Sequence, residues 1–140
     1  SFRTECFVGF GRQLGAPVIG IVSTKFQDWL YEFFGNPLNP SYMTGVLSKF
    51  SRPMTFWQRL QNTLLIKNTI ATVKAYSKEQ IAIANKYFDH HIADLKELYD
   101  GVAMVLVNEH ASISDVRPTT PDIVPIGGLH VDHNDEPLSE

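Results

Sequence analysis

Short apolar runs alternate with helix-like patterns along the chain, and this order predicts strands that are separated by helices. The apolar runs cover residues 18–22, 104–107 and 123–126, and β-branched side chains recur in them. Continuous runs of this length are typical of strands that are buried on both faces of a parallel sheet. Helices between such strands indicate an α/β fold.

Three shorter segments have helical patterns. Residues 5–14 mix apolar and polar positions with helical spacing. Gly15 can adopt the left-handed backbone conformation that ends many helices, and Pro17 cannot continue the helix. Residues 26–34 predict a short helix, because their large apolar side chains fall on one stripe. A further short helix is expected near residues 92–99.

The longest helix is predicted to begin at Thr55. The Thr55 hydroxyl can cap the first turn and Gln58 can reach back to it, which is the pattern of a capping box. No proline or glycine follows before about residue 88. We interpret this stretch as one long helix, or as two helices that meet near Ser77. The preceding residues 35–41 have the composition of a loop.

Polar residues that follow the strands are the first place to look for a site. In a parallel sheet, ligands gather beyond the carboxyl ends of the strands. These ends carry Ser23 and Thr24, residues 108–110, and Gly127 with Gly128. We therefore expect these three segments to meet at one edge of the sheet.

Aromatic residues are dense between positions 26 and 42, and they offer two interpretations. Tyr and Trp combine apolar area with a polar tip, which suits a pocket for lipophilic hydroxylated compounds. The same rings can instead form the core. The set consists of Phe26, Trp29, Tyr31, Phe33, Phe34 and Tyr42.

The charge balance bears on partners. The 140 residues include 12 Lys and Arg against 15 Asp and Glu, which gives a net charge of −3. The share of hydrophobic residues, 44%, is typical of a globular chain. This charge argues against nucleic-acid binding, since a phosphate backbone requires clustered Lys and Arg. Residues 118–140 hold five acidic residues and no Lys or Arg, so this end is expected to be solvated.

Other candidate motifs favour structural interpretations. Residues 9–15 have the glycine count of a dinucleotide fingerprint, but the strand follows them, so a helix with two packing glycines is favoured. Residues 130–135 contain metal-ligand types within the acidic end, where solvation is expected. His110 beside Glu109 can act as a base, although no G-x-S-x-G motif supplies a nucleophile.

Features of targeting are missing from the sequence. Cys6 is the single cysteine, which excludes an internal disulfide. The longest uncharged runs fall short of the ~18 residues that a membrane-spanning helix needs, and no signal peptide fits. Because the chain begins with Ser1 rather than Met, we expect a fragment whose missing ends carry the targeting.

Five segments, in order, resemble motifs of the animal UDP-glycosyltransferases, the family that includes the UDP-glucuronosyltransferases. They are PVIGI at 17–21, FGNPLNPSY at 34–42, MTFWQRLQN at 54–62, VN at 107–108 with RPTTP at 117–121, and GGLH at 127–130. The resemblance covers nearly the whole chain, and the correct order of all five segments makes it specific.

The resemblance implies a partial Rossmann-like N-terminal domain of a GT-B glycosyltransferase. Residues 1–128 would form the C-terminal half of this acceptor-binding domain, and residues 129–140 an acidic linker toward a donor domain that binds the UDP-sugar. The implied reaction uses the UDP-sugar as co-substrate and no metal or other cofactor. A histidine deprotonates a hydroxyl of a small lipophilic acceptor, and an aspartate orients that histidine.

No residue of this chain matches the family's catalytic histidine or aspartate, so we expect the fragment to be inactive alone. Acceptor recognition remains as its expected role. By the family pattern, the acceptor-binding residues are Ser23, Thr24, Trp29, Phe34 and Tyr42, with Asn108 and His110 at the next strand end. The resemblance also implies detoxification at the lumenal side of the endoplasmic reticulum membrane, through an anchor outside these residues.

A second hypothesis is a non-catalytic module that binds lipophiles or a partner protein.

A sheet that lacks its first strands leaves an edge or an apolar face uncovered, which predicts self-association of the isolated chain as a homo-oligomer.

Overall fold

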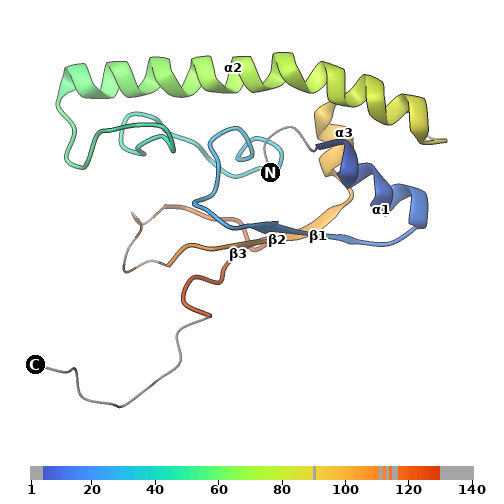
Figure 1. Cartoon of the computed structure of the whole chain (residues 1–140). Coiled ribbons are helices and arrows are strands. Elements are labelled where there is room, and N and C mark those ends of the chain that lie inside the picture. Colours follow the sequence, from blue (N-terminus) through green and yellow to red (C-terminus); the bar gives the residue numbers. More distant parts are fainter. Residues whose placement is uncertain (1–4, 90, 111, 113, 115–116, 130–140) are drawn as a thin grey trace, which may run out of the picture.

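Two layers make up the protein in its computed structural model, which describes residues 5–89, 91–110, 112, 114 and 117–129. A long helix, α2 (Phe56–Tyr87), lies across one face of a three-stranded sheet, and the loop that precedes it runs between the two (Figure 1). A short 3-10 turn, η1 (Glu5–Val8), continues into α1 (Gly9–Leu14). This pair and α3 (Leu95–Tyr99) pack at one end of the sheet.

The sheet confirms the predicted parallel α/β arrangement. Its strands are β1 (Val18–Val22), β2 (Val102–Val107) and β3 (Ile123–Pro125), in the order β1-β2-β3. Both neighbouring pairs are parallel, with Val22 opposite Val107 and Val107 opposite Pro125. The last residues of the three strands therefore stand side by side, which places the segments that follow them at one edge of the sheet.

The predicted helix ends are confirmed by their caps. The Thr55 hydroxyl accepts a hydrogen bond from the Gln58 backbone N–H, and the Gln58 side chain accepts one from the Thr55 N–H. From this capping box α2 continues as a single helix through Ser77, whose hydroxyl donates to the Val73 carbonyl. Gly15 ends α1 at a φ of 61°, the left-handed conformation that glycine adopts without steric cost.

Two of the three glycines in residues 9–15, Gly9 and Gly11, pack closely against neighbouring side chains. A Cβ atom at Gly9 would lie 2.5 Å from the Phe88 ring, and one at Gly11 would lie 2.1 Å from the Val18 side chain. Both glycines are buried in α1. Their small size lets this helix approach α2 and β1 closely, as the helix interpretation of this segment predicted.

The helix predicted over residues 26–34 is wrong. This segment is a series of turns, in which the Leu30 N–H donates to the Gln27 carbonyl and the Phe33 N–H to the Leu30 carbonyl. All four residues from Asp28 to Tyr31 are buried. A helix with one apolar stripe would turn part of this run to solvent, and the burial of the whole run outweighs the helical spacing.

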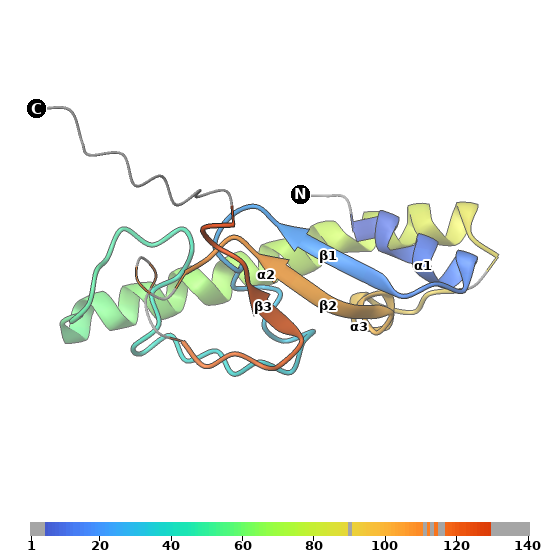
Figure 2. The ribbon, with the colours of Figure 1, turned by 90° about the horizontal axis from the view of Figure 1, so that it is seen from below.

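Burial of the strands on both faces is also wrong for β1 and for part of β2. Ile19 and Ile21 are 56% and 72% exposed, and Met104 is exposed as well. Seen from below, the three strands lie in front of α2, and no described helix covers that side of β1 and β2 (Figure 2). The apolar side chains there have no layer to pack against in the described chain. Self-association through this face stays a prediction.

The larger of two hydrophobic core clusters in the described residues lies between the sheet and the turns of residues 26–34. Val105, Val107 and Ile123 contribute from the strands. The aromatic and apolar partners from the turns and the loop are Phe26, Trp29, Leu30, Tyr31, Phe34 and Met43.

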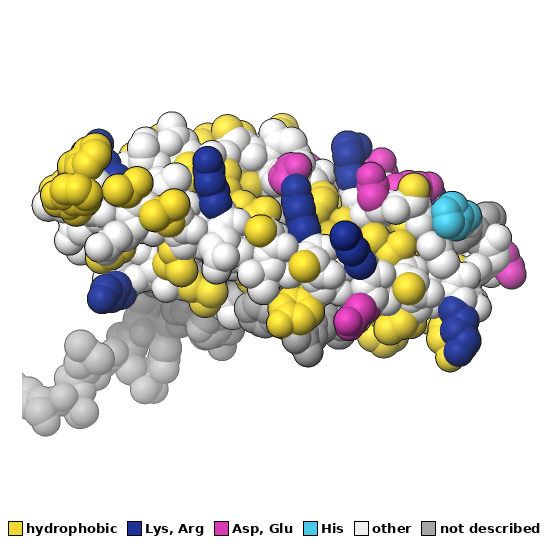
Figure 3. Space-filling view, turned by 90° about the horizontal axis from the view of Figure 1, so that it is seen from above, with side chains coloured by type: hydrophobic (Ala, Val, Ile, Leu, Met, Phe, Trp, Pro, Cys, Tyr) yellow, Lys and Arg dark blue, Asp and Glu magenta, His cyan; other side chains and the backbone are white. Residues whose placement is uncertain are grey.

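The outward face of α2 mixes Lys and Arg side chains with hydrophobic ones (Figure 3). No described helix is long and apolar enough to cross a membrane.

Candidate functional site

The carboxyl ends of the strands meet, as the sequence predicts. The Asn108 backbone N–H donates to the Val22 carbonyl at 2.8 Å, and its side-chain amide donates to the Ser23 carbonyl at 3.2 Å. The Gly127 N–H donates to the Glu109 carbonyl at 3.1 Å. These contacts join all three strand ends at one edge of the sheet.

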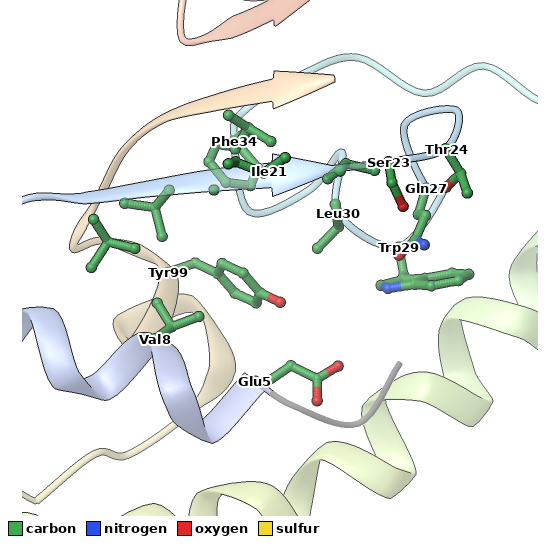
Figure 4. Close-up of a pocket in the computed structure, with 15 residues that line it drawn as sticks. Glu5, Val8, Ile21, Ser23, Thr24, Gln27, Trp29, Leu30, Phe34 and Tyr99 are labelled. Carbon is green, nitrogen blue, oxygen red and sulfur yellow. The ribbon is translucent and has the colours of Figure 1, made fainter. Parts of the chain in front are cut away.

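A cavity of about 260 Å³ lies along β1, from Val18 to Ser23 and Thr24 just beyond its carboxyl end (Figure 4). Ser23 and Thr24 come from the end of the strand, and Gln27 from the turns that follow it. The rest of its lining is mainly apolar, with Trp29, Leu30, Phe34 and Tyr99 as the largest side chains. The cavity therefore offers hydroxyl and amide groups beside an apolar wall, the composition typical of sites for small organic molecules.

Four of the seven predicted site residues line this cavity: Ser23, Thr24, Trp29 and Phe34. Trp29 is 4% exposed and Phe34 is 9% exposed, so these rings belong to the core and form the wall at the same time. At these two positions the rings are core residues that also line a cavity, and their role in ligand binding stays a prediction.

The other three predicted site residues lie in different surroundings. Asn108 is exposed beside the cavity and bonds to the Ser23 carbonyl. His110 is exposed, with its Nδ1 atom 2.6 Å from the Ser112 hydroxyl, so its contact is a serine rather than Glu109. Tyr42 lines a separate groove at the start of α2, together with Arg59 and Pro53.

Among the lining residues that sequence reasoning did not identify, three carry polar side-chain groups: Glu5, Gln27 and Tyr99. Tyr99 ends α3, and its ring stacks on Phe33 with 5.0 Å between the ring centroids. Glu5 lies in η1, and its carboxylate faces the same space as Trp29 (Figure 4). Both line the cavity because it extends along β1 toward the amino ends of the strands, where η1 and α3 lie (Figure 1). No local sequence pattern reveals that arrangement.

The electrostatics keep the Tyr99 hydroxyl protonated. Burial of the ring raises the pKa of Tyr99 well above its usual range, and the negative charge of Glu5 raises it further. A deprotonated phenol would be a buried anion, which costs free energy without a paired cation. Tyr99 therefore offers a neutral hydroxyl to this cavity across the physiological pH range.

A charged cluster lies beside the turns that form the wall. Asp28 is buried and accepts a hydrogen bond from the Val46 N–H at 2.8 Å. Burial raises the pKa of Asp28, while the Val46 hydrogen bond and the Arg117 charge oppose that rise. The Arg117 guanidinium donates to the Thr44 carbonyl and, at 3.4 Å, to the Tyr31 hydroxyl. These bonds fix the loop on the turns.

The described residues hold no group of three or more His, Cys, Asp or Glu side chains that could bind a metal. The metal-ligand types at residues 130–135 lie outside the described part of the chain. The chemistry that the described cavity supports is the binding of a small molecule that combines an apolar body with hydroxyl groups.

Comparison with known proteins matches this chain to one family. The family model described as "UDP-glucoronosyl and UDP-glucosyl transferase" matches residues 13–140. UDP-glucosyltransferase 2 of Dactylopius coccus is 32% identical over 132 residues, which cover 93% of this chain and 26% of that protein. UDP-glucuronosyltransferase 1A8 of Rattus norvegicus is 27% identical over 135 residues, covering 96% of this chain and 25% of that protein.

A viral protein is similar as well. The ecdysteroid UDP-glucosyltransferase of Lymantria dispar multicapsid nuclear polyhedrosis virus is 26% identical over 126 residues, which cover 89% of this chain and 25% of that protein. The chain thus spans about a quarter of the length of these curated relatives. No solved structure gives a significant match.

Proposed function

Because the chain belongs to the UDP-glucoronosyl and UDP-glucosyl transferase family, we propose that it is the acceptor-binding part of an enzyme that glycosylates small lipophilic molecules. The reaction is the transfer of a sugar from a UDP-sugar to a hydroxyl group of the acceptor. The observation that carries this proposal is the cavity at the strand ends, where Ser23 and Thr24 adjoin a wall of buried aromatic rings.

The role of these residues in the proposed reaction is to position the acceptor. An alcohol is a weak nucleophile until a base held at hydrogen-bond distance takes its proton, so the hydroxyl must be fixed precisely. The rings of Trp29 and Phe34 hold the apolar body, and the hydroxyls of Ser23 and Thr24 orient its polar end. We assign the base itself to none of the described side chains.

A bulky side chain at the strand end is expected to block acceptor binding. In Ser23→Phe, the new ring would occupy the space beside Thr24 and Gln27. We expect the affinity for 1-naphthol, measured by isothermal titration calorimetry, to fall at least about tenfold, which corresponds to ~1.4 kcal/mol. Ser51→Phe is the matched control, because Ser51 is an exposed loop residue before α2. Equal affinities of the two variants would contradict the proposed site.

The 140-residue chain on its own is expected to bind an acceptor without glycosylating it. We infer this from the absence of any match to the family's catalytic histidine and aspartate. The chain would be incubated with 1-naphthol and either UDP-glucose or UDP-glucuronic acid, and the products analysed by mass spectrometry. Formation of a naphthyl glycoside would contradict the inference. Naphthol binding without transfer, even by a longer protein that contains this chain, would favour the non-catalytic module.

The family also supports a proposal for the cellular setting, which is detoxification at the lumenal side of the endoplasmic reticulum membrane. The proposal rests on the resemblance to the UDP-glucuronosyltransferases, and relatives of that name align with most of this chain. Neither the described helices nor the cavity bears on that setting.

A further inference from the structure

The outward side of α2 carries large apolar side chains that the fold does not use. A helix that covers a core needs apolar residues on one face only. On α2 these are Ile66, which is buried, and Ile70 and Val73, which pack against the core. Trp57 and Leu64 are nevertheless 68% and 60% exposed. Several large apolar side chains that lie together on a surface mark an interaction site.

These exposed side chains belong to one continuous stripe. Helix residues that are three or four positions apart are neighbours on the same face. The Phe56 ring adjoins the start of the stripe and meets the Trp57 ring edge to face, with 5.3 Å between the ring centroids. We refer to the stripe together with Phe56 as the outer α2 face. Its residues, all exposed, are Phe56, Trp57, Leu60, Leu64, Lys67, Ala71, Lys74 and Lys78.

The outer α2 face lies in the positively charged part of the chain. Residues 33–78 contain six Lys or Arg and no Asp or Glu, a charge of +6, whereas the rest of the chain carries −9. On the side that Figure 3 shows, no Asp or Glu side chain lies near the start of α2. Glu32 pairs with Lys74 at 2.7 Å from outside this segment. Positive charge that is concentrated in this way attracts an anionic surface.

A bilayer that contains anionic lipids fits both the apolar and the charged part of this face. Trp and Phe are typical anchors at the level of the lipid headgroups, and Leu adds apolar contact area. Each Lys or Arg near an anionic surface strengthens binding about fivefold. A nucleic-acid backbone would pair with the lysines but leave Leu60 and Leu64 without an apolar partner. A second copy of the chain would add more positive charge to the contact.

We propose that the outer α2 face is a peripheral membrane-binding surface for anionic bilayers. The rings of Phe56 and Trp57 and the side chains of Leu60 and Leu64 enter the headgroup region. The lysines further along the stripe contact the lipid phosphates. The helix lies along the bilayer, and the sheet stands on the opposite side of α2 (Figure 1). This inference is independent of the proposed function, needs only an anionic bilayer and does not specify a cellular membrane.

Vesicle sedimentation tests the preference for anionic lipid. The probes are vesicles of phosphatidylcholine alone and of an equimolar mixture of phosphatidylcholine and phosphatidylserine. We expect the 140-residue chain to bind the mixed vesicles at least about tenfold more tightly, because the lysines of the stripe face the bilayer. Added salt should weaken this binding by screening the charges. Equal binding to both kinds of vesicle, or binding to neither, would overturn the proposal.

Charge reversal tests which surface meets the bilayer. We expect Lys67→Glu to weaken binding to the mixed vesicles at least about tenfold. Lys96→Glu is the matched control, because Lys96 is exposed on α3 and the two variants have the same net charge. Thermal denaturation checks that both variants are folded. Equal affinities of the two variants would show that net charge rather than the outer α2 face drives binding, which would overturn the proposal.

Tryptophan fluorescence tests the insertion of the apolar end. The chain has two tryptophans, and Trp29 is only 4% exposed, so Trp57 is the one that can respond to lipid. We expect the emission to shift to shorter wavelength with mixed vesicles and to be quenched by brominated lipid. An unchanged emission, or the same shift in Trp57→Leu, would overturn the insertion of this end.

Two further measurements decide between the bilayer and other occupants. Analytical ultracentrifugation of the chain and of Leu64→Gln detects a second copy on this face. A dimer that dissociates in Leu64→Gln, without vesicle binding by the original chain, would assign the face to self-association. Titration with duplex DNA detects a nucleic-acid site, and DNA binding as tight as that of the mixed vesicles would overturn the preference for lipid.

Discussion

The Asn62→Ala variant is expected to lose about 4 kcal/mol of unfolding free energy. Three backbone groups would lose their hydrogen-bond partner, and each buried group left unpaired costs ~1–3 kcal/mol. Asn62 lies on α2 and is 0% exposed. Its Oδ1 atom accepts a hydrogen bond from the Gly45 N–H at 3.0 Å. Its amide donates to the carbonyls of Pro40 and Met43, each at 2.8 Å. The same side chain thus ties the loop before α2 to the helix.

Urea denaturation followed by circular dichroism would measure this loss, together with a fall in the melting temperature of roughly 10 °C. Gln61→Ala is the matched control, since Gln61 is the exposed neighbour on the same helix and should change stability by less than ~0.5 kcal/mol. A loss below about 1 kcal/mol in Asn62→Ala would mean that water replaces the amide, and that the loop is not held by this residue.

The segments that resemble the family share this structural role. Asn36, in the GNPLNPS loop, donates to the Pro118 carbonyl at 3.0 Å and accepts from the Thr120 N–H at 2.8 Å. It therefore joins the loop to the RPTTP segment, whose Arg117 bonds back to the Thr44 carbonyl. Together with Asn62, these contacts hold together segments that lie far apart in the sequence. Of the motifs joined by these contacts, only the one at 34–42 reaches the cavity, through Phe34.

Local chemistry in the sequence predicts much of the fold. The capping box at Thr55, the left-handed Gly15 and the apolar strand runs each act through neighbouring residues, and the structure confirms all of them. Residues 26–34 could not be predicted in this way. Their helical spacing is real, but the hydrogen bond from the Val46 N–H to Asp28 and the burial of the whole run are set by distant parts of the chain.

Only the strand-end residues of the candidate site could be predicted from the sequence. Parallel strands bring their carboxyl ends together whatever their side chains are, so Ser23, Thr24 and Asn108 could be placed from the order of elements alone. The contribution of Glu5 and Tyr99 depends on how η1 and α3 pack at the end of the sheet. No periodicity in the sequence encodes that packing.

Gly127→Ala is expected to disrupt the strand ends themselves. A Cβ atom at Gly127 would lie 2.7 Å from the Glu109 carbonyl carbon and 2.9 Å from the His110 nitrogen. These are backbone atoms, which cannot rotate away as the end of a long side chain can. The segment after β2 must therefore move away from the segment after β3, and we expect a loss of ~3 kcal/mol, at the upper end of the usual cost of overpacking.

The neighbouring glycine separates this clash from ordinary backbone strain. Gly128 has a φ of 91°, and a Cβ atom there meets nothing within 4 Å, so Gly128→Ala should cost only ~1 kcal/mol through its backbone conformation. Because Asn108 adjoins the displaced segment and bonds to the Ser23 carbonyl, Gly127→Ala should also weaken 1-naphthol binding, whereas Gly128→Ala should not. Calorimetric titration of both variants measures this difference. Equal stability and equal affinity in the two variants would show that the strand ends tolerate separation, and that their contact does not shape the cavity.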